Sequence, residues 1–140
     1  MPAEPVLCVV EDGVALVTLN NPPLNLVTLE LTRQLNGLVA TLATDEAVRI
    51  MVLTGAGTKA FCAGSDLKEF PRMMAPGAVV PQKLALENEA YSRVDDFPKP
   101  TIAALNGLAF GGGLELAVCC DLIVAEEGGR IALPDSPSSK

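Results

Sequence analysis

Histidine and tryptophan are absent from this sequence of 140 residues, and the other aromatics amount to one tyrosine and four phenylalanines. Without histidine the chain can form neither a Ser-His-Asp triad nor a Cys-His nucleophile pair. Acid–base chemistry must therefore come from Asp, Glu, Lys, Tyr or Cys side chains. The sequence also has no CxxC pair, so we predict no metal site.

Cysteine is scarce and unevenly spaced. The four residues are Cys8, Cys62, Cys119 and Cys120. Two of them are adjacent, a spacing that suits neither a disulfide framework nor a zinc knuckle. We interpret them as buried free thiols in a reducing compartment.

Positive charge is also in short supply, with 10 Lys and Arg against 17 Asp and Glu, for a net charge of −7. This balance argues against general nucleic-acid binding, which needs a basic face to neutralise phosphates. A few local cations would still be enough for one small phosphorylated ligand. Lys59, Lys68 and Arg72 are the candidates.

The sequence lacks a long uninterrupted apolar segment. The most apolar region, 101–125, contains Asn106, Glu115 and Asp121 as well as three consecutive glycines, so we do not expect a membrane span. Residues 1–10 have no basic stretch and no long apolar core of the signal-peptide kind. We therefore predict a cytoplasmic protein that does not enter the membrane.

What the sequence does contain is typical of one folded α/β domain, because 49% of its residues are apolar and β-branched runs alternate with helical patterns. Asp12-Gly13 between two β-branched runs predicts a hairpin. Apolar residues at helical spacing predict a helix over 28–44, which Thr28 can cap. The other predicted strands are 48–54, 101–105, 121–125 and 130–133, and the other helices are 66–70, 82–96 and 114–120. Loops are predicted at 61–65 and 73–81.

A glycine-bearing turn follows the strand predicted at 48–54. Gly55, Gly57 and Ala60 match the loose dinucleotide pattern GxGxx(G/A). That pattern needs a helix directly behind it to direct an N-terminus at a pyrophosphate. Gly64 would end such a helix after barely one turn. A nucleotide-binding module is thus an alternative with weak support.

A second glycine turn, Gly111-Gly112-Gly113, precedes the helix predicted at 114–120. Its amide groups would be bare of side chains, and they could stabilise an oxyanion that develops on a thioester carbonyl. A second donor could come from the first turn, near Ser65. Glu115 lies in the first turn of this helix between apolar residues, which suits it to proton transfer near neutral pH. Close packing and helix-dipole stabilisation are the structural alternatives for these residues.

Together these motifs resemble those of the crotonase family, the enoyl-CoA hydratases and isomerases. One motif runs from Val52-Leu53-Thr54-Gly55-Ala56-Gly57 to Phe61-Cys62-Ala63-Gly64-Ser65-Asp66-Leu67. The other runs from Lys99-Pro100-Thr101-Ile102-Ala103-Ala104-Leu105-Asn106-Gly107 to Gly111-Gly112-Gly113-Leu114-Glu115-Leu116-Ala117. The resemblance covers about 14–135. It implies a spiral of ββα repeats of the ClpP/crotonase type, which is incomplete here, and a homo-oligomeric trimer or hexamer.

The resemblance also implies a site for an acyl-CoA thioester, with coenzyme A as part of the substrate and no separate cofactor. The amides of Ser65 and Gly112 would form the oxyanion hole, and Glu115 would match the first catalytic glutamate of hydratases. The residues that would approach the substrate or the coenzyme are Leu24, Leu26, Ala63, Asp66, Leu67, Lys68, Leu108, Gly111 and Pro134.

Two departures from the family bear on activity. Asp135, after Pro134, stands where hydratases have a second glutamate, so hydration and isomerisation both stay open. The chain is also much shorter than family members, and we expect a truncated crotonase-like domain over 1–135 with a polar tail over 136–140. It would be an enoyl-CoA hydratase/isomerase, or else an inactive form that binds CoA weakly or joins full-length subunits. An exposed apolar patch is expected in either case.

Overall fold

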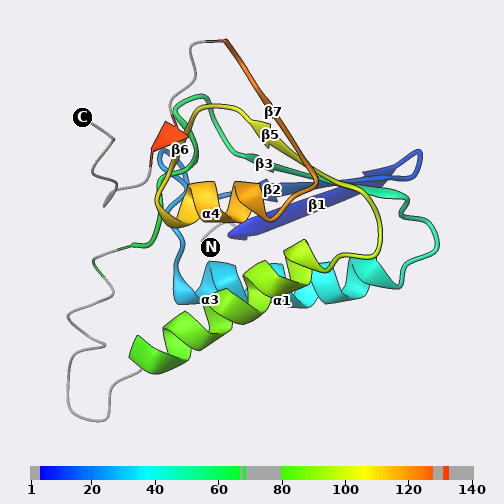
Figure 1. Cartoon of the computed structure of the whole chain (residues 1–140), viewed down its shortest axis with the longest axis horizontal. Helices are drawn as coiled ribbons and strands as arrows, with labels where there is room; N and C mark the ends of the chain where they lie inside the picture. The colour runs from blue at the N-terminus through cyan, green and yellow to red at the C-terminus, as the bar shows by residue number, and fades with distance from the viewer. Residues whose placement is uncertain (1–3, 67, 69–79, 128–130, 133–140) are drawn as a thin grey trace.

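The computed structural model describes residues 4–66, 68, 80–127 and 131–132. Strands and helices alternate along the chain, as the sequence predicts (Figure 1). The elements are β1 (Val6–Glu11), β2 (Val14–Leu19), α1 (Leu29–Ala43), β3 (Ile50–Gly55), β4 (Ala60–Cys62), α3 (Val80–Asp95), β5 (Thr101–Leu105), β6 (Leu108–Phe110), α4 (Gly112–Val118), β7 (Leu122–Ala125) and β8 (Ile131–Ala132).

The strands form two sheets. The larger has the order β1-β2-β3-β5-β7 and is parallel except for the β1–β2 hairpin, and the smaller has the order β4-β6-β8 and is parallel throughout. Each parallel strand of the large sheet from β3 onward is followed in sequence by one of the small sheet. The chain therefore winds through repeated strand–strand–helix units, as the predicted ββα spiral requires.

The hairpin and the first helix follow from local sequence. Asp12 and Gly13 both have positive φ, 52° and 81°, as a two-residue hairpin turn needs. The Thr28 side chain accepts a hydrogen bond from the Leu31 amide at 3.0 Å and so caps α1. The apolar stripe of α1 faces the sheet, and its buried members include Leu35 and Val39. Both predictions are confirmed.

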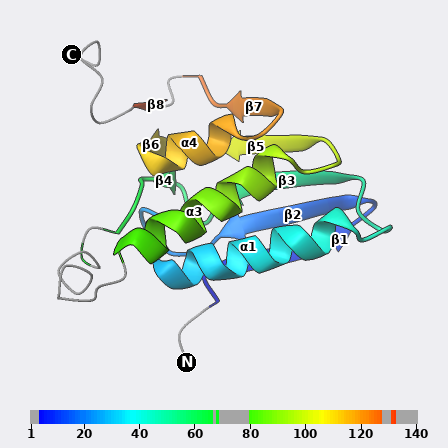
Figure 2. The ribbon, with the colours of Figure 1, turned by 60° about the horizontal axis from the view of Figure 1, so that its bottom comes forward.

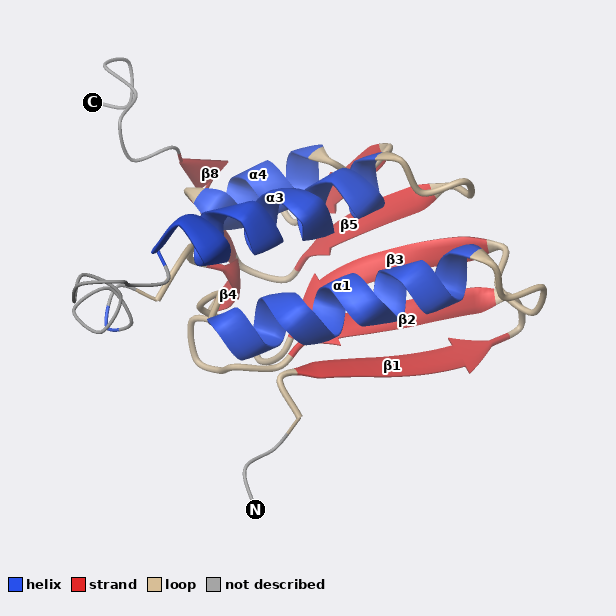
Figure 3. Ribbon diagram, turned by 90° about the horizontal axis from the view of Figure 1, so that it is seen from below, coloured by secondary structure: helices blue, strands red, loops and turns tan. Residues whose placement is uncertain are grey.

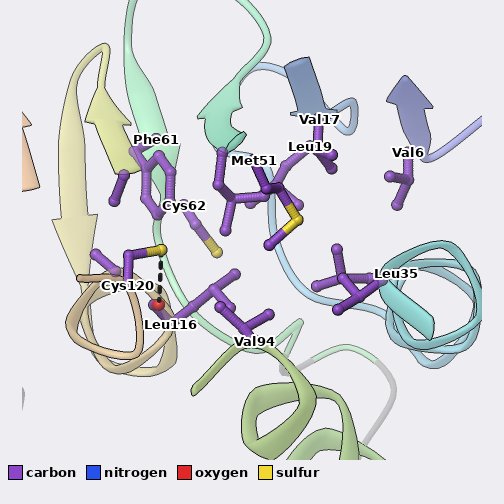
Figure 4. Packing of buried hydrophobic residues seen from close by; sticks show 14 of the residues in the cluster. Val6, Val17, Leu19, Leu35, Met51, Phe61, Cys62, Val94, Leu116 and Cys120 are labelled. Atoms are coloured by element: carbon purple, nitrogen blue, oxygen red, sulfur yellow. Dashed lines mark hydrogen bonds between the residues drawn. The ribbon is translucent and has the colours of Figure 1, made fainter. Parts of the chain in front are cut away.

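The core lies between one face of the large sheet and the helices. Helices α1 and α3 run side by side beneath this face, and α4 lies beside α3 (Figures 2 and 3). Val17, Leu19 and Met51 project from the strands towards Leu35 and Val94 on the helices (Figure 4). Burying each such side chain contributes about 1.5–3 kcal/mol. Phe61 and Leu116 extend this core to the small sheet and α4.

No helix of the described residues covers the opposite face of the large sheet (Figure 1). The strand register places one apolar residue from each strand in a row across that face: Val9, Leu16, Val52, Ile102 and Leu122. Val9 and Leu122 are 58% and 62% exposed. The exposed apolar patch that the sequence predicts is thus present.

Several local predictions were wrong. Residues 60–62 are a strand where a loop was expected, and 108–110 form a strand that the sequence pattern did not reveal, because three residues are too few to show a period. Helix α4 begins at Gly112 rather than Leu114, and α3 begins at Val80, within the predicted loop. Cys8 is exposed rather than buried because it lies on the edge strand β1, and Cys119, at the end of α4, is half-buried.

The predicted helix at 66–70 and loop at 73–79 fall largely outside the described residues, although Lys68 lies in a short 3₁₀ turn. None of the helices in the described ranges combines the length and the apolar character that crossing a bilayer requires.

Candidate functional site

The two glycine turns lie side by side. Strands β4 and β6 pair in parallel, so the turns that follow them emerge at the same edge of the small sheet. Gly64 and Gly111 have positive φ, 102° and 55°. A Cβ added at Gly64 would lie 3.3 Å from the Phe110 oxygen and 3.7 Å from the Gly112 nitrogen. The backbones of the two turns are therefore in direct contact.

Each turn presents an amide that has no backbone acceptor among the described residues. The Val27 amide donates to the Gly64 oxygen at 2.8 Å, and the Asp66 amide donates to the Val27 oxygen at 2.9 Å, which holds the chain on both sides of Ser65. Gly112 is the first residue of α4, where amides have no acceptor within the helix. Within the part of the chain that the structure describes, neither the Ser65 nor the Gly112 amide has a backbone acceptor.

Two asparagines hold the segment between β3 and β4, which leads through β4 to the Gly64 turn. The fully buried Asn25 donates through Nδ2 to the Ala56 and Ala60 oxygens at 3.0 and 2.9 Å. Asn106 accepts from the Gly55 amide at 3.0 Å and donates to the Ala60 oxygen at 3.0 Å. Sequence reasoning missed Asn25 altogether, because a lone asparagine before a helix does not reveal which distant carbonyls it will meet.

Helix α3 reaches both turns with side chains that the sequence did not single out. The Ser65 Oγ donates to the Glu87 Oε1 at 3.2 Å. The Tyr91 hydroxyl donates to the Gly112 oxygen at 3.0 Å. Burial raises the pKa of Tyr91, and the nearby Glu87 and Glu115 carboxylates raise it further, so the phenol remains a hydrogen-bond donor. The spacing of four between Glu87 and Tyr91 along the helix shows only that they share one face, and it does not show what that face contacts.

Glu115 lies in the first turn of α4, as predicted, but its side chain is exposed. The expected apolar enclosure is wrong, because Leu116 and Ala117 point into the core and leave Glu115 on the outer side of the helix. Its carboxylate is close enough to influence Tyr91 electrostatically. Glu115 thus stands near the Gly112 turn and open to solvent.

The structure brings some of the predicted substrate-contacting residues to this region. The Ala63 amide donates to the Leu24 oxygen at 3.0 Å, which joins the segment before α1 to the first turn. Leu24 is exposed, and Leu26 and Ala63 are half-buried. The three residues are therefore adjacent to the turn that carries Ser65.

The remaining predicted residues are distributed around the two turns. Asp66 follows Ser65, and its carboxylate accepts a hydrogen bond from the Lys68 amide. Lys68 is exposed. Leu108 begins β6 and is half-buried, while Gly111 precedes α4 and is buried. Leu67, Pro134 and Asp135 lie outside the described residues.

The dinucleotide alternative is wrong. The glycine turn formed by Gly55 and Gly57 leads into strand β4, and no helix N-terminus follows it to face a pyrophosphate. Over the described ranges, no three His, Cys, Asp or Glu side chains gather in a group that could hold a metal ion.

Comparison with known proteins places these motifs in a family. The profile of the enoyl-CoA hydratase/isomerase family matches residues 10–137, a range that contains both glycine turns. The chain belongs to this family. Among its relatives, YngF of Bacillus subtilis is 40% identical over 126 residues, which are 89% of this chain and 48% of that protein. The short-chain-enoyl-CoA hydratase of Clostridium acetobutylicum is 35% identical over 127 residues, again 89% and 48% of the two chains.

A solved structure shows the same fold. The crystal structure of an enoyl-CoA hydratase/carnitine racemase from Magnetospirillum magneticum superposes with a TM-score of 0.88 at 35% identity and covers 95% of this chain. This chain covers 50% of that one. The fold is therefore crotonase-like. The chain spans about half the length of the curated relatives it matches.

Proposed function

We propose that this protein acts on acyl-CoA thioesters with chemistry of the enoyl-CoA hydratase/isomerase type. The observation that carries the proposal is that the Ser65 and Gly112 amides, on glycine turns that touch each other, have no backbone acceptor within the described ranges. A thioester oxygen that accepted hydrogen bonds from both would be stabilised as it gains negative charge in an enolate. Family membership over residues 10–137 supports the choice of thioester as the substrate.

In this proposal Glu115 moves the proton. Hydration of an enoyl thioester places a hydroxyl on Cβ and a proton on Cα, while isomerisation moves one proton between carbons. Glu115 lies in the first turn of the helix that begins at Gly112, and this closeness in sequence and structure supports its choice as the acid–base group. Asp135 would be the second carboxylate, and its identity leaves both reactions open.

The coenzyme would bind beside the first turn. Leu24, Leu26 and Ala63 would contact the coenzyme where the Ala63–Leu24 hydrogen bond joins the segment before α1 to the Gly64 turn. Asp66 and Lys68 would lie farther along, where the exposed Lys68 ammonium could meet a phosphate. We include Leu67, Leu108, Gly111 and Pro134 in the same substrate path. A cytoplasmic location and assembly as a trimer or hexamer belong to this proposal as well.

The experiment is incubation of the purified protein with crotonyl-CoA, following the loss of enoyl-thioester absorbance. Glu115→Gln should abolish turnover, a loss of about 10²–10⁴-fold, and should retain binding of the unreactive analogue butyryl-CoA in a calorimetric titration. Glu46→Gln, an exposed carboxylate after α1, is the matched control and should be unchanged. Turnover that survives Glu115→Gln would exclude this residue as the base, and a wild-type chain without butyryl-CoA binding would refute the proposal.

A second candidate function is favoured by the apolar row across the uncovered face of the large sheet, which includes Val9, Leu16 and Leu122. A surface of this kind is typical of protein contacts. In this alternative the chain binds CoA weakly or joins longer subunits of its family and turns nothing over. It predicts mixed oligomers on co-expression with such a subunit, by a sizing measurement. Turnover of crotonyl-CoA by the pure chain would contradict it.

A further inference from the structure

Helix α3 contacts both residues whose amides are the proposed donors, Ser65 and Gly112, through two side chains on one of its faces. Glu87 and Tyr91 are one helical turn apart, so they are neighbours on the helix surface. Glu87 accepts from the Ser65 hydroxyl at 3.2 Å, and Tyr91 donates to the Gly112 oxygen at 3.0 Å. Ser65 and Gly112 belong to turns after different strands, β4 and β6. The same helix face therefore links two segments that are distant in sequence.

The fit at Gly112 is close. A Cβ added there would lie 3.3 Å from the Tyr91 hydroxyl oxygen, so the phenol would have to shift by a few tenths of an ångström to make room for a side chain. Burial and the Glu87 and Glu115 carboxylates raise the pKa of Tyr91, which keeps its proton in place for the Gly112 oxygen.

The helix itself is held rigidly. Ala90 and Val94, on the same helix, are 0% and 1% exposed, and Val94 packs in the main core (Figure 4). These anchors do not involve the polar groups of Glu87 or Tyr91. Loss of either polar contact should therefore leave the helix docked while it loosens the turn that the side chain contacts.

We propose that α3 is a brace that sets the separation of the two amide donors, with Glu87 and Tyr91 as positioning residues. This inference rests on the proposed function, because it concerns the same oxyanion hole. A preorganised pair of donors stabilises developing charge only if both amides stay aimed at one oxygen. Displacements of about 1 Å can cost about 10²-fold in rate. Loosening one turn should thus lower kcat and leave KM nearly unchanged.

The test measures carbonyl polarisation directly and needs no turnover. Butyryl-CoA labelled with ¹³C at the thioester carbonyl is bound to the full chain, and isotope-edited infrared spectroscopy reports the carbonyl stretch. Wild type should lower the frequency relative to free ligand. Tyr91→Phe and Glu87→Ala should each lose part of that shift. Where turnover is measurable, each should lose about 2- to 10-fold in kcat, as for one hydrogen bond.

Three controls sharpen the result. Glu87→Gln keeps an oxygen that can accept from the Ser65 hydroxyl and should restore the wild-type shift. Glu87→Ala and Ser65→Ala should be non-additive in a double-mutant cycle, because both changes remove the same Ser65–Glu87 contact. Glu89→Gln, on the outer face of the same helix where Glu89 pairs with Arg93, should match wild type.

The possible failures are distinguishable. If wild type lowers the carbonyl stretching frequency and both Tyr91→Phe and Glu87→Ala lower it by as much as wild type does, the brace is overturned and the proposed function stands. If wild type binds the ligand without any shift, or does not bind it, the oxyanion hole is rejected and the brace with it. If Tyr91→Phe proves unfolded by circular dichroism, the comparison of Glu87→Ala with Glu87→Gln decides alone.

Discussion

Gly113 brings the backbone of α4 against the backbone of β4, and a single added methyl group tests that contact. A Cβ at Gly113 would lie 2.0 Å from the Cys62 oxygen and 2.6 Å from its carbonyl carbon, whereas real Cβ atoms essentially never come within 3.0 Å of another heavy atom. The difference, 3.0 minus 2.0, means that α4 and β4 must separate by at least about 1 Å. No side chain can turn aside to relieve this clash, because both atoms belong to the backbone.

The chain supplies a matched control in Gly37, which lies within α1 and has no heavy atom within 4 Å of an added Cβ. Alanine is the better helix former by about 0.8–1.0 kcal/mol, so Gly37→Ala should raise the free energy of unfolding. Gly113→Ala gains the same propensity but overpacks the interface, which costs about 1–3 kcal/mol or more. We expect a net loss of stability and, because Gly112 moves with α4, weaker thioester polarisation.

The assay is urea unfolding followed by far-ultraviolet circular dichroism, with both variants and wild type at one pH. The reasoning requires shifts of opposite sign in the two midpoints at similar denaturant slopes. A Gly113→Ala protein that is stabilised as much as Gly37→Ala would refute the close approach of α4 to β4, and with it the placement of the Gly112 turn.

Three further predictions concern the support of the site and the cysteines. Asn25→Ala leaves the Ala60 oxygen with one donor fewer, so the free energy of unfolding should fall by about 1–3 kcal/mol; a neutral effect in urea titrations would contradict the role of this amide. Burial raises the pKa of Cys62 from its ordinary 9.0 to about 11. The unfolded chain therefore loses this proton first, and stability should fall by up to about 3 kcal/mol as pH rises from 9 to 11. Cys62→Ala should flatten that part of the pH profile, and an unchanged slope would exclude this thiol as its cause. Cys8, the exposed cysteine, should react first with a thiol reagent in the folded protein, while Cys62 and Cys120 should need urea; a fast phase that persists in Cys8→Ser would show that another thiol is accessible.

Local features of the sequence predicted local structure well. Asp12-Gly13 predicted the hairpin because few residue pairs accept positive φ at two successive positions. Thr28 and the apolar stripe through Leu35 predicted α1 because a cap and a period of 3.6 residues depend only on near neighbours. The strands β4 and β6 escaped prediction because three residues carry no measurable period.

The candidate site divides in the same way. Ser65, Gly112 and Glu115 could be chosen from the sequence, because glycine turns and an acid in a first helical turn are visible in the order of the residues and because their motifs match a family. Glu87 and Tyr91 could not, since nothing in a helical segment tells which distant backbone it will meet.

The sequence alone determined the hairpin, the first helix and the strands of the large sheet, and it showed two glycine turns whose amides could serve as donors. Only the tertiary structure decided that these turns touch, that Asn25 joins the segment between β3 and β4 to the segment before α1, and that α3 contacts both turns. The physical reason is the distance along the chain over which each interaction acts. Backbone sterics and helical periodicity act over a few residues, whereas the meeting of Ser65 with Gly112 depends on the parallel register of β4 and β6, which the packing of the whole core sets.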